Sequence, residues 1–193
     1  MVINFSLVSH AAAALSFLLL AILVGTRYLR RNTDRALLLA ALVSAIWAGS
    51  LVAQIIWNQP PFFIRYLLEL VRDGAWIAVL FALLKDSSRS GTLATKLRRI
   101  IGTSSVILII TLLTCGTLEY ALGWQLFDGK TKIIGQIALS LLGVCLVEQI
   151  WRNSVSFGRS SIKYLCIGIG GLFAYDFFMY SDALLFGQVS DSF

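Results

Sequence analysis

Charged side chains inside long apolar runs are the residues of this sequence best suited to chemistry. Five acidic or basic groups lie well inside such runs: Glu69, Arg72, Asp73, Asp176 and Asp182. A charge at the centre of a membrane helix costs about 2.5 to 3.5 kcal/mol on the translocon scale, so these groups must pair with one another or serve a function. Two interpretations stay open: a structural polar lock, and a pocket that senses a ligand or a proton.

The spacing within residues 62 to 84 predicts which of these groups meet. Steps of three and four put the polar residues and one tryptophan on a single helix face: Arg65, Glu69, Arg72, Asp73 and Trp76. Counting inward from the ends of both runs places Arg72 and Asp176 at about the same depth. We therefore expect an Arg72 to Asp176 contact, with Asp73 or Glu69 helping from the helix of Arg72. Asp182 lies nearer the outer surface, where it can meet water or Arg65.

The elements that position these groups follow from composition. Hydrophobic residues make up 58% of the 193 positions and charged residues only 13%, with a mean hydropathy of +0.83, whereas soluble proteins carry about 25% charged residues. Lipid offers the backbone no partners, and runs this long without alternation exclude a barrel, so the fold class is all-α: a polytopic transmembrane helix bundle in a single domain over 1–193. Six spans are predicted, at about residues 6–27, 35–57, 62–84, 97–120, 132–151 and 161–186.

The basic residues predict the orientation of the bundle. Twelve of the sixteen Lys and Arg residues lie in or beside the first, third and fifth connections, whereas the fourth holds only Lys130 and Lys132 and the second holds none. Cytoplasmic loops are enriched in Lys and Arg, so both chain ends are expected outside the cytoplasm. The expected location is a bacterial inner membrane.

Small residues recur in two of the runs. The second predicted span carries a stripe at every fourth position, and the last span is rich in glycine; the residues are Ala41, Ala45, Gly49 and Ala53, and Gly168, Gly170 and Gly171. Small side chains let membrane helices approach closely, so both sets predict helix packing. For the glycines of the last span, a hinge or a binding site stays open.

Other classes of site find no support in the pattern. Cys115, Cys145 and Cys166 lie in separate apolar runs without a paired motif, and His10 is isolated, so no metal site, disulfide or cofactor is expected. The net charge of +6 sits in short connections, which argues for membrane topology and against nucleic acid. Glu148, four residues before Arg152, predicts a surface ion pair.

Three stretches also carry a resemblance to a known family. They read ELVRDGAW over 69–76, VEQIWRN over 147–153, and IKYLCIGIGGLFAYDFFMYSDALLF over 162–186. These stretches resemble the amino-terminal membrane region of the PrsK family, sensor histidine kinases associated with the exosortase (PEP-CTERM) sorting system.

The resemblance implies a membrane input domain of a two-component system that regulates exopolysaccharide production and envelope protein sorting. It further implies a homodimer, and a response regulator reached through a cytoplasmic kinase region with a phosphoacceptor helix and an ATP-binding domain. The sequence ends at Phe193 without those regions, so we expect a truncated or partial product with no catalytic residue and no kinase activity of its own.

Two other functions stay open from the sequence. Intramembrane charges also mark ion pathways, which favours a small transporter or channel component, although the chain has no inverted repeat. A membrane scaffold that recruits envelope enzymes through its small-residue faces needs no pocket. In the sensor interpretation, a signal changes packing between the third and sixth helices.

Overall fold

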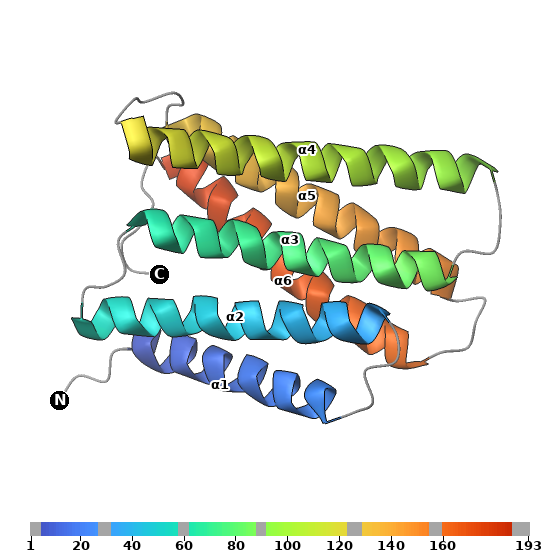
Figure 1. Cartoon of the computed structure of the whole chain (residues 1–193), viewed down its shortest axis with the longest axis horizontal. Coiled ribbons are helices and arrows are strands. Elements are labelled where there is room, and N and C mark those ends of the chain that lie inside the picture. Colours follow the sequence, from blue (N-terminus) through green and yellow to red (C-terminus); the bar gives the residue numbers. More distant parts are fainter. Residues whose placement is uncertain are drawn as a thin grey trace. The chain divides into compact units, whose positions relative to one another are not determined.

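A computed structural model describes residues 5–26, 32–57, 62–87, 92–122, 129–154 and 160–186. Over these residues the chain forms six helices (Figure 1): α1 (Phe5–Gly25), α2 (Asn32–Trp57), α3 (Phe62–Ser87), α4 (Thr92–Leu122), α5 (Gly129–Ser154) and α6 (Ser160–Phe186). Each predicted apolar run coincides with one helix, which confirms the all-α prediction.

Five of these helices are long and apolar enough to cross a membrane: α1, α2, α4, α5 and α6. The chain is therefore a multi-pass membrane protein. The helix α3 is equally long, but Arg65, Glu69, Arg72 and Asp73 all lie in its first half, so it does not qualify by apolar composition. The sixth span predicted over 62–84 and the outside position of the chain ends stay predictions.

The described residues divide into two compact units, the first of which ends at Val79. It contains α1, α2 and most of α3, and α1 and α2 lie side by side (Figure 1). α1 ends at Gly25, where the Thr26 amide donates to the Ile22 carbonyl at 2.9 Å and the Thr26 hydroxyl donates to the Leu23 carbonyl at 3.0 Å. These bonds satisfy carbonyls that the end of a helix leaves without intrahelical partners.

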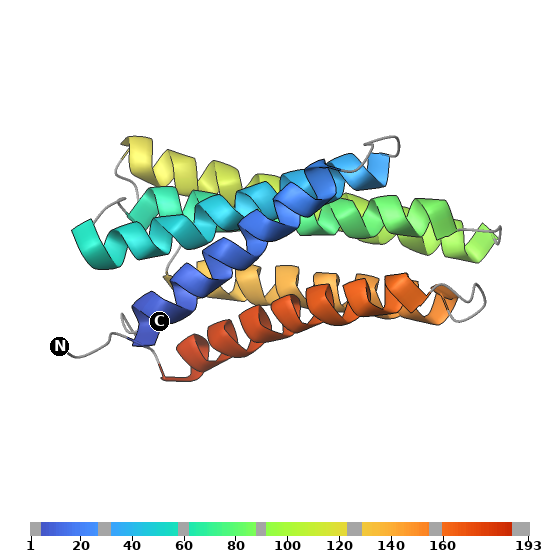
Figure 2. The same ribbon diagram turned by 90° about the horizontal axis from the view of Figure 1, so that it is seen from below.

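The second unit begins at Leu80 and contains the end of α3 with α4, α5 and α6. Its closest pair is α5 and α6, which run antiparallel (Figure 2). Gly143 of α5 receives the Phe173 ring of α6 so closely that a Cβ at Gly143 would stand 2.5 Å from ring carbon. A Cβ at Gly135, also of α5, would lie 2.6 Å from a terminal methyl carbon of Leu112 of α4. Glycine on α5 thus allows contact on two sides.

The small residues that the sequence singled out take varied positions. In α2 the buried small residues are Ala40, Ala41, Ser44 and Ala48, so of the predicted stripe Ala41 is buried while Ala45, Gly49 and Ala53 are half-buried. In α6, a Cβ at Gly170 would lie 3.3 Å from Val147 of α5, whereas Gly168 and Gly171 are exposed with no described atom within 4 Å of such a Cβ.

Hydroxyl groups on α4 bond to the backbone of their own helix. The Thr111 and Thr114 hydroxyls donate to the Ile107 and Ile110 carbonyls at 2.8 Å, and the Thr117 hydroxyl donates to the Leu113 carbonyl at 2.9 Å. All three residues are exposed. Polar residues can therefore lie on the outer face of a membrane helix, because their protons are already bound.

Candidate functional site

The first unit contains a buried ion pair on α3. Arg72 donates from Nε at 3.0 Å and from a terminal guanidinium nitrogen at 2.9 Å to a single carboxylate oxygen of Asp73, the next residue in the chain. Both residues are almost completely buried, at 2% and 3% exposure. The helix thus carries opposite charges next to each other, and the desolvation cost of each is offset locally.

An aromatic ring of α2 also contacts Arg72. The guanidinium carbon lies 4.1 Å from the centroid of a Trp47 ring. A cation over an aromatic face gains about 0.5 to 1 kcal/mol when exposed and about 2 kcal/mol or more when desolvated. Arg72 is therefore held both by a carboxylate of its own helix and by a ring of the neighbouring helix.

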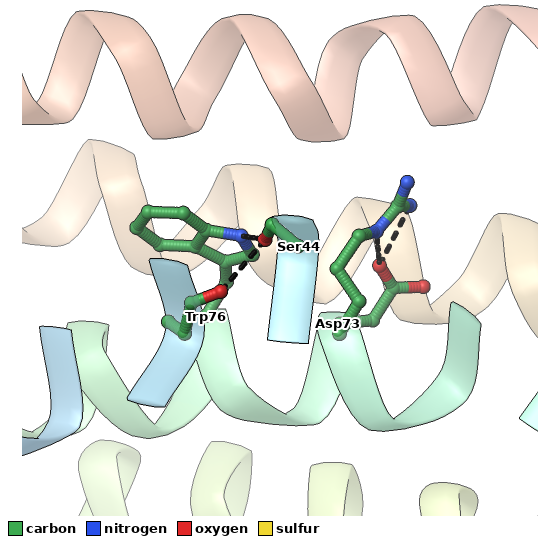
Figure 3. A network of polar contacts seen from close by, with 5 residues as sticks. Ser44, Asp73 and Trp76 are labelled. Atoms are coloured by element: carbon green, nitrogen blue, oxygen red, sulfur yellow. Dashed lines mark hydrogen bonds and ion pairs between the residues drawn. The ribbon is translucent and has the colours of Figure 1, made fainter. Parts of the chain in front are cut away.

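One turn further along α3, a second polar contact joins the same two helices. The Trp76 indole nitrogen donates to the Ser44 hydroxyl at 2.9 Å, and this hydroxyl donates to the Ala40 carbonyl at 2.7 Å. Figure 3 shows this chain of bonds beside the Asp73 carboxylate. Trp76 also meets Phe17 of α1, with ring centroids 6.3 Å apart in a tilted arrangement. Trp76 therefore touches both neighbouring helices of its unit.

A third contact follows the same pattern at the start of α3. Arg65 donates to the side-chain carbonyl of Gln54. Residue numbers rise along α3 while those of the partners fall along α2, so the helices run antiparallel: Arg65 with Gln54, Arg72 with Trp47, Trp76 with Ser44. The face that the spacing predicted thus meets α2. We call these six residues together with Asp73 the α2–α3 polar interface.

The other predicted members of the site occupy different places. Glu69 is half-buried on α3 and takes part in interactions of its own. Asp176 is buried and Asp182 is half-buried, both on α6 in the second unit. Of the carboxylates predicted to hold Arg72, Asp73 does so. The predicted contact between Arg72 and Asp176 joins residues of different units and stays a prediction.

Sequence reasoning missed the α2 side of this interface. Ser44 and Trp47 are three residues apart and therefore lie on one face of α2, just as Arg72 and Trp76, four residues apart, lie on one face of α3. Two such pairs can meet between antiparallel helices. That match was a usable signal. The stripe of small residues directed the prediction to the adjacent face of α2. Neither Ser44 nor Trp47 carries a charge, so neither stood out as a partner for the polar face of α3.

The arrangement at this site favours holding helices together over covalent chemistry. The Trp76 indole is bonded to the Ser44 hydroxyl, this hydroxyl is bonded to a backbone carbonyl, and Arg72 is paired with Asp73. Among the described residues, no group of three or more His, Cys, Asp or Glu side chains is placed to hold a metal ion. His10 of α1 is half-buried. The predicted ion pair between Glu148 and Arg152 is confirmed at 2.7 Å, with both side chains largely exposed.

Comparison with known proteins adds no relative: no family model matches the chain, and neither a curated protein nor a solved structure is significantly similar to it. The resemblance to the PrsK family therefore rests on the three stretches alone. Function must be argued from the site.

Proposed function

We propose that this chain is a membrane-embedded input domain of the kind that controls a two-component sensor histidine kinase. The observation that carries the proposal is the α2–α3 polar interface, in which directional contacts hold two antiparallel helices in one register. Apolar membrane interfaces can slide with little penalty, whereas hydrogen bonds and an ion pair must break before they re-form elsewhere. Such an interface favours discrete packings, which is what a switch requires.

A signal would act by favouring one packing over another. A lipid-soluble ligand or a change in the bilayer that separates Trp76 from Ser44, or Arg72 from Trp47, would release α3 to rotate or shift against α2. Since Asp73 travels on the same helix as Arg72, the charge stays neutralised during such a movement. A register shift therefore exposes no unpaired charge to lipid, where such a charge would cost several kcal/mol.

The resemblance to the PrsK family supplies the proposed output. A cytoplasmic kinase region, working as a homodimer, would phosphorylate a response regulator that controls exopolysaccharide production and envelope protein sorting. With both ends of the described bundle outside, an odd number of further spans would connect it to that region. The bacterial inner membrane is the location that this proposal requires.

The test joins the chain, through one added span, to the cytoplasmic region of a sensor histidine kinase in liposomes. Phosphotransfer from ATP to the response regulator is measured for the parent, for Trp47→Leu and for Ser44→Ala. We expect basal phosphotransfer to change at least twofold in both variants, whereas Glu148→Gln, at an exposed ion pair, should leave it unchanged. Folded variants with parental activity would refute the sensor proposal; ion flux through the liposomes that requires Arg72 would favour a transporter.

The proposed orientation has its own test. Reporter fusions after Arg31, Thr92 and Ser156 should report the cytoplasm, and fusions after Gln59, Gly129 and Ser190 should report the outside, because basic residues concentrate on the cytoplasmic side. The fusions after Gln59 and Thr92 together are decisive for α3, since they flank this helix. Signals from the same side of the membrane at both positions would remove α3 from the set of spans.

A further inference from the structure

The second unit contains a buried polar side chain, Gln136 of α5, that has no hydrogen-bond partner within the described part of the chain. Gln136 of α5 is 2% exposed, and among the described residues neither its carboxamide oxygen nor its carboxamide nitrogen has a hydrogen-bond partner. Buried amides are nearly always hydrogen-bonded, since an unpaired one forfeits its interactions with water. Gln136 thus calls for a partner from outside the chain's own described side chains.

The register of α5 and α6 places this amide between the two helices. Gly143 faces Phe173 and Val147 faces Gly170, so residue numbers on the two helices sum to a nearly constant value. Gln136 precedes Gly143 by seven residues, which is two turns along the same face. It therefore lies on the α6-facing side of α5, at the level of Tyr180.

Neighbouring groups on α5 define the chemistry of this position. Ser140, one turn after Gln136 and also buried, donates its hydroxyl proton to the Ile137 carbonyl at 2.9 Å, so its oxygen is left to accept. Lys132, one turn before Gln136, is paired with Glu119 of α4, which neutralises its charge. The position offers acceptor oxygens, an amide nitrogen with two N–H donors, and no uncompensated charge from the described α5 residues next to it.

We propose that the α5–α6 helix pair binds a neutral hydroxyl group at Gln136, supplied by a water molecule or by a small alcohol. The hydroxyl donates to the Gln136 carboxamide oxygen or to the Ser140 oxygen and accepts from the Gln136 amide nitrogen. Gln136 lies six residues from Lys130, where the apolar segment of α5 begins, or about 9 Å along the helix at 1.5 Å per residue. The site is independent of the α2–α3 polar interface and of the function proposed for it.

The first test observes the amide directly in the unaltered protein. Protein labelled with 15N at glutamine and tryptophan, in lipid nanodiscs, is examined for magnetisation transfer between water and the Gln136 amide protons, which Gln136→Leu assigns. The control is the Trp76 indole proton, equally buried but bonded to Ser44. A water signal at Gln136 and none at Trp76 identifies water as the ligand. A saturable shift of the Gln136 amide on titration with 1-propanol identifies the alcohol, and the absence of both effects overturns the proposal.

The second test uses the sign of a stability change. Leucine at position 136 removes the amide while keeping a similar volume. If the amide binds a hydroxyl group, Gln136→Leu loses that bond and unfolds at a lower fraction of denaturing detergent than the parent. If the amide is unoccupied, leucine relieves a buried unpaired group and the variant unfolds at a higher fraction, which also overturns the proposal.

Discussion

The two units of this protein hold their helices together by different means. In the first, α2 and α3 meet through polar and aromatic side chains: Arg72 on Trp47, Trp76 on Ser44, and a buried ion pair. In the second, α5 meets α6 and α4 where glycine lets a large apolar side chain reach the backbone. The α2–α3 polar interface depends on matched partners. Apart from the ion pair between Lys132 of α5 and Glu119 of α4, the contacts described in the second unit depend on an absent side chain.

This difference predicts how each unit fails. Removing one member of a matched polar pair leaves the other buried without compensation, so damage is large and a second change can repair it. Adding atoms at a glycine creates a steric conflict that no polar partner relieves. Three variants with matched controls separate these two behaviours, in order of decreasing effect.

The largest effect is expected at the buried ion pair. Arg72→Met leaves the Asp73 carboxylate without its partner and should destabilise the protein by about 3 to 5 kcal/mol, the range for one-sided removal of a buried ion pair. The measurement is unfolding by increasing fractions of denaturing detergent, followed by tryptophan fluorescence. Glu148→Gln removes one partner of the exposed pair and should cost less than about 1 kcal/mol.

The double variant Arg72→Met with Asp73→Leu sharpens this result. Because both charges leave together, it should regain most of the stability lost by Arg72→Met. Equal destabilisation of the single and double variants would contradict the pairing, and would assign the loss to the contact with Trp47 instead.

A smaller effect is expected in the second unit. Gly143→Ala places a Cβ 2.5 Å from the Phe173 ring, which cannot fold away as a flexible chain end would. Overpacking of this kind costs about 1 to 3 kcal/mol. The control, Gly168→Ala on exposed α6 surface, should be neutral or slightly stabilising because alanine favours helix. Comparable losses of stability in both variants would attribute the effect to a change in helix flexibility and not to the contact with Phe173.

The smallest effect is expected for the hydrogen bond between Trp76 and Ser44. Trp76→Phe keeps an aromatic ring near Phe17 but removes the indole donor, at a cost of about 1 kcal/mol. Combining it with Ser44→Ala in a double-mutant cycle isolates the bond, since each single change removes the bond together with other contacts. Additive losses across the cycle would deny the pair any energetic coupling.

Sequence reasoning succeeded where periodicity decides the outcome. The six helices follow from apolar length, and the polar face of α3 follows from steps of three and four between Arg65, Arg72 and Trp76. Adjacent opposite charges at Arg72 and Asp73 also invited a local pair, which the structure contains. These features are local, so a single chain segment carries the information.

Sequence reasoning was weaker where two segments must be matched. Nothing within α3 indicates that its polar face meets α2, and the contact with Asp176 of α6, expected on grounds of depth, stays a prediction. Similarly, Gly143 is an isolated glycine in α5, whereas the conspicuous glycines of α6 include two without close neighbours among the described residues. Partner choice depends on the shapes of both surfaces, which spacing along one helix does not record. Gln136 was overlooked because the search of the sequence selected charged residues, and glutamine is uncharged.

The hydroxyl bonds of α4 have a mechanical consequence. Thr114 and Thr117 each place their one hydroxyl proton within hydrogen-bond distance of two carbonyls, three and four residues back. A carbonyl that accepts a side-chain proton shares its lone pairs with the helical bond, which slightly weakens that bond and often bends the helix. Repeated over neighbouring turns, this sharing weakens the helical hydrogen bonds in the second half of α4. Replacing both threonines with valine would keep the shape of the side chains, and spin labels placed on either side should then report a narrower distribution of distances.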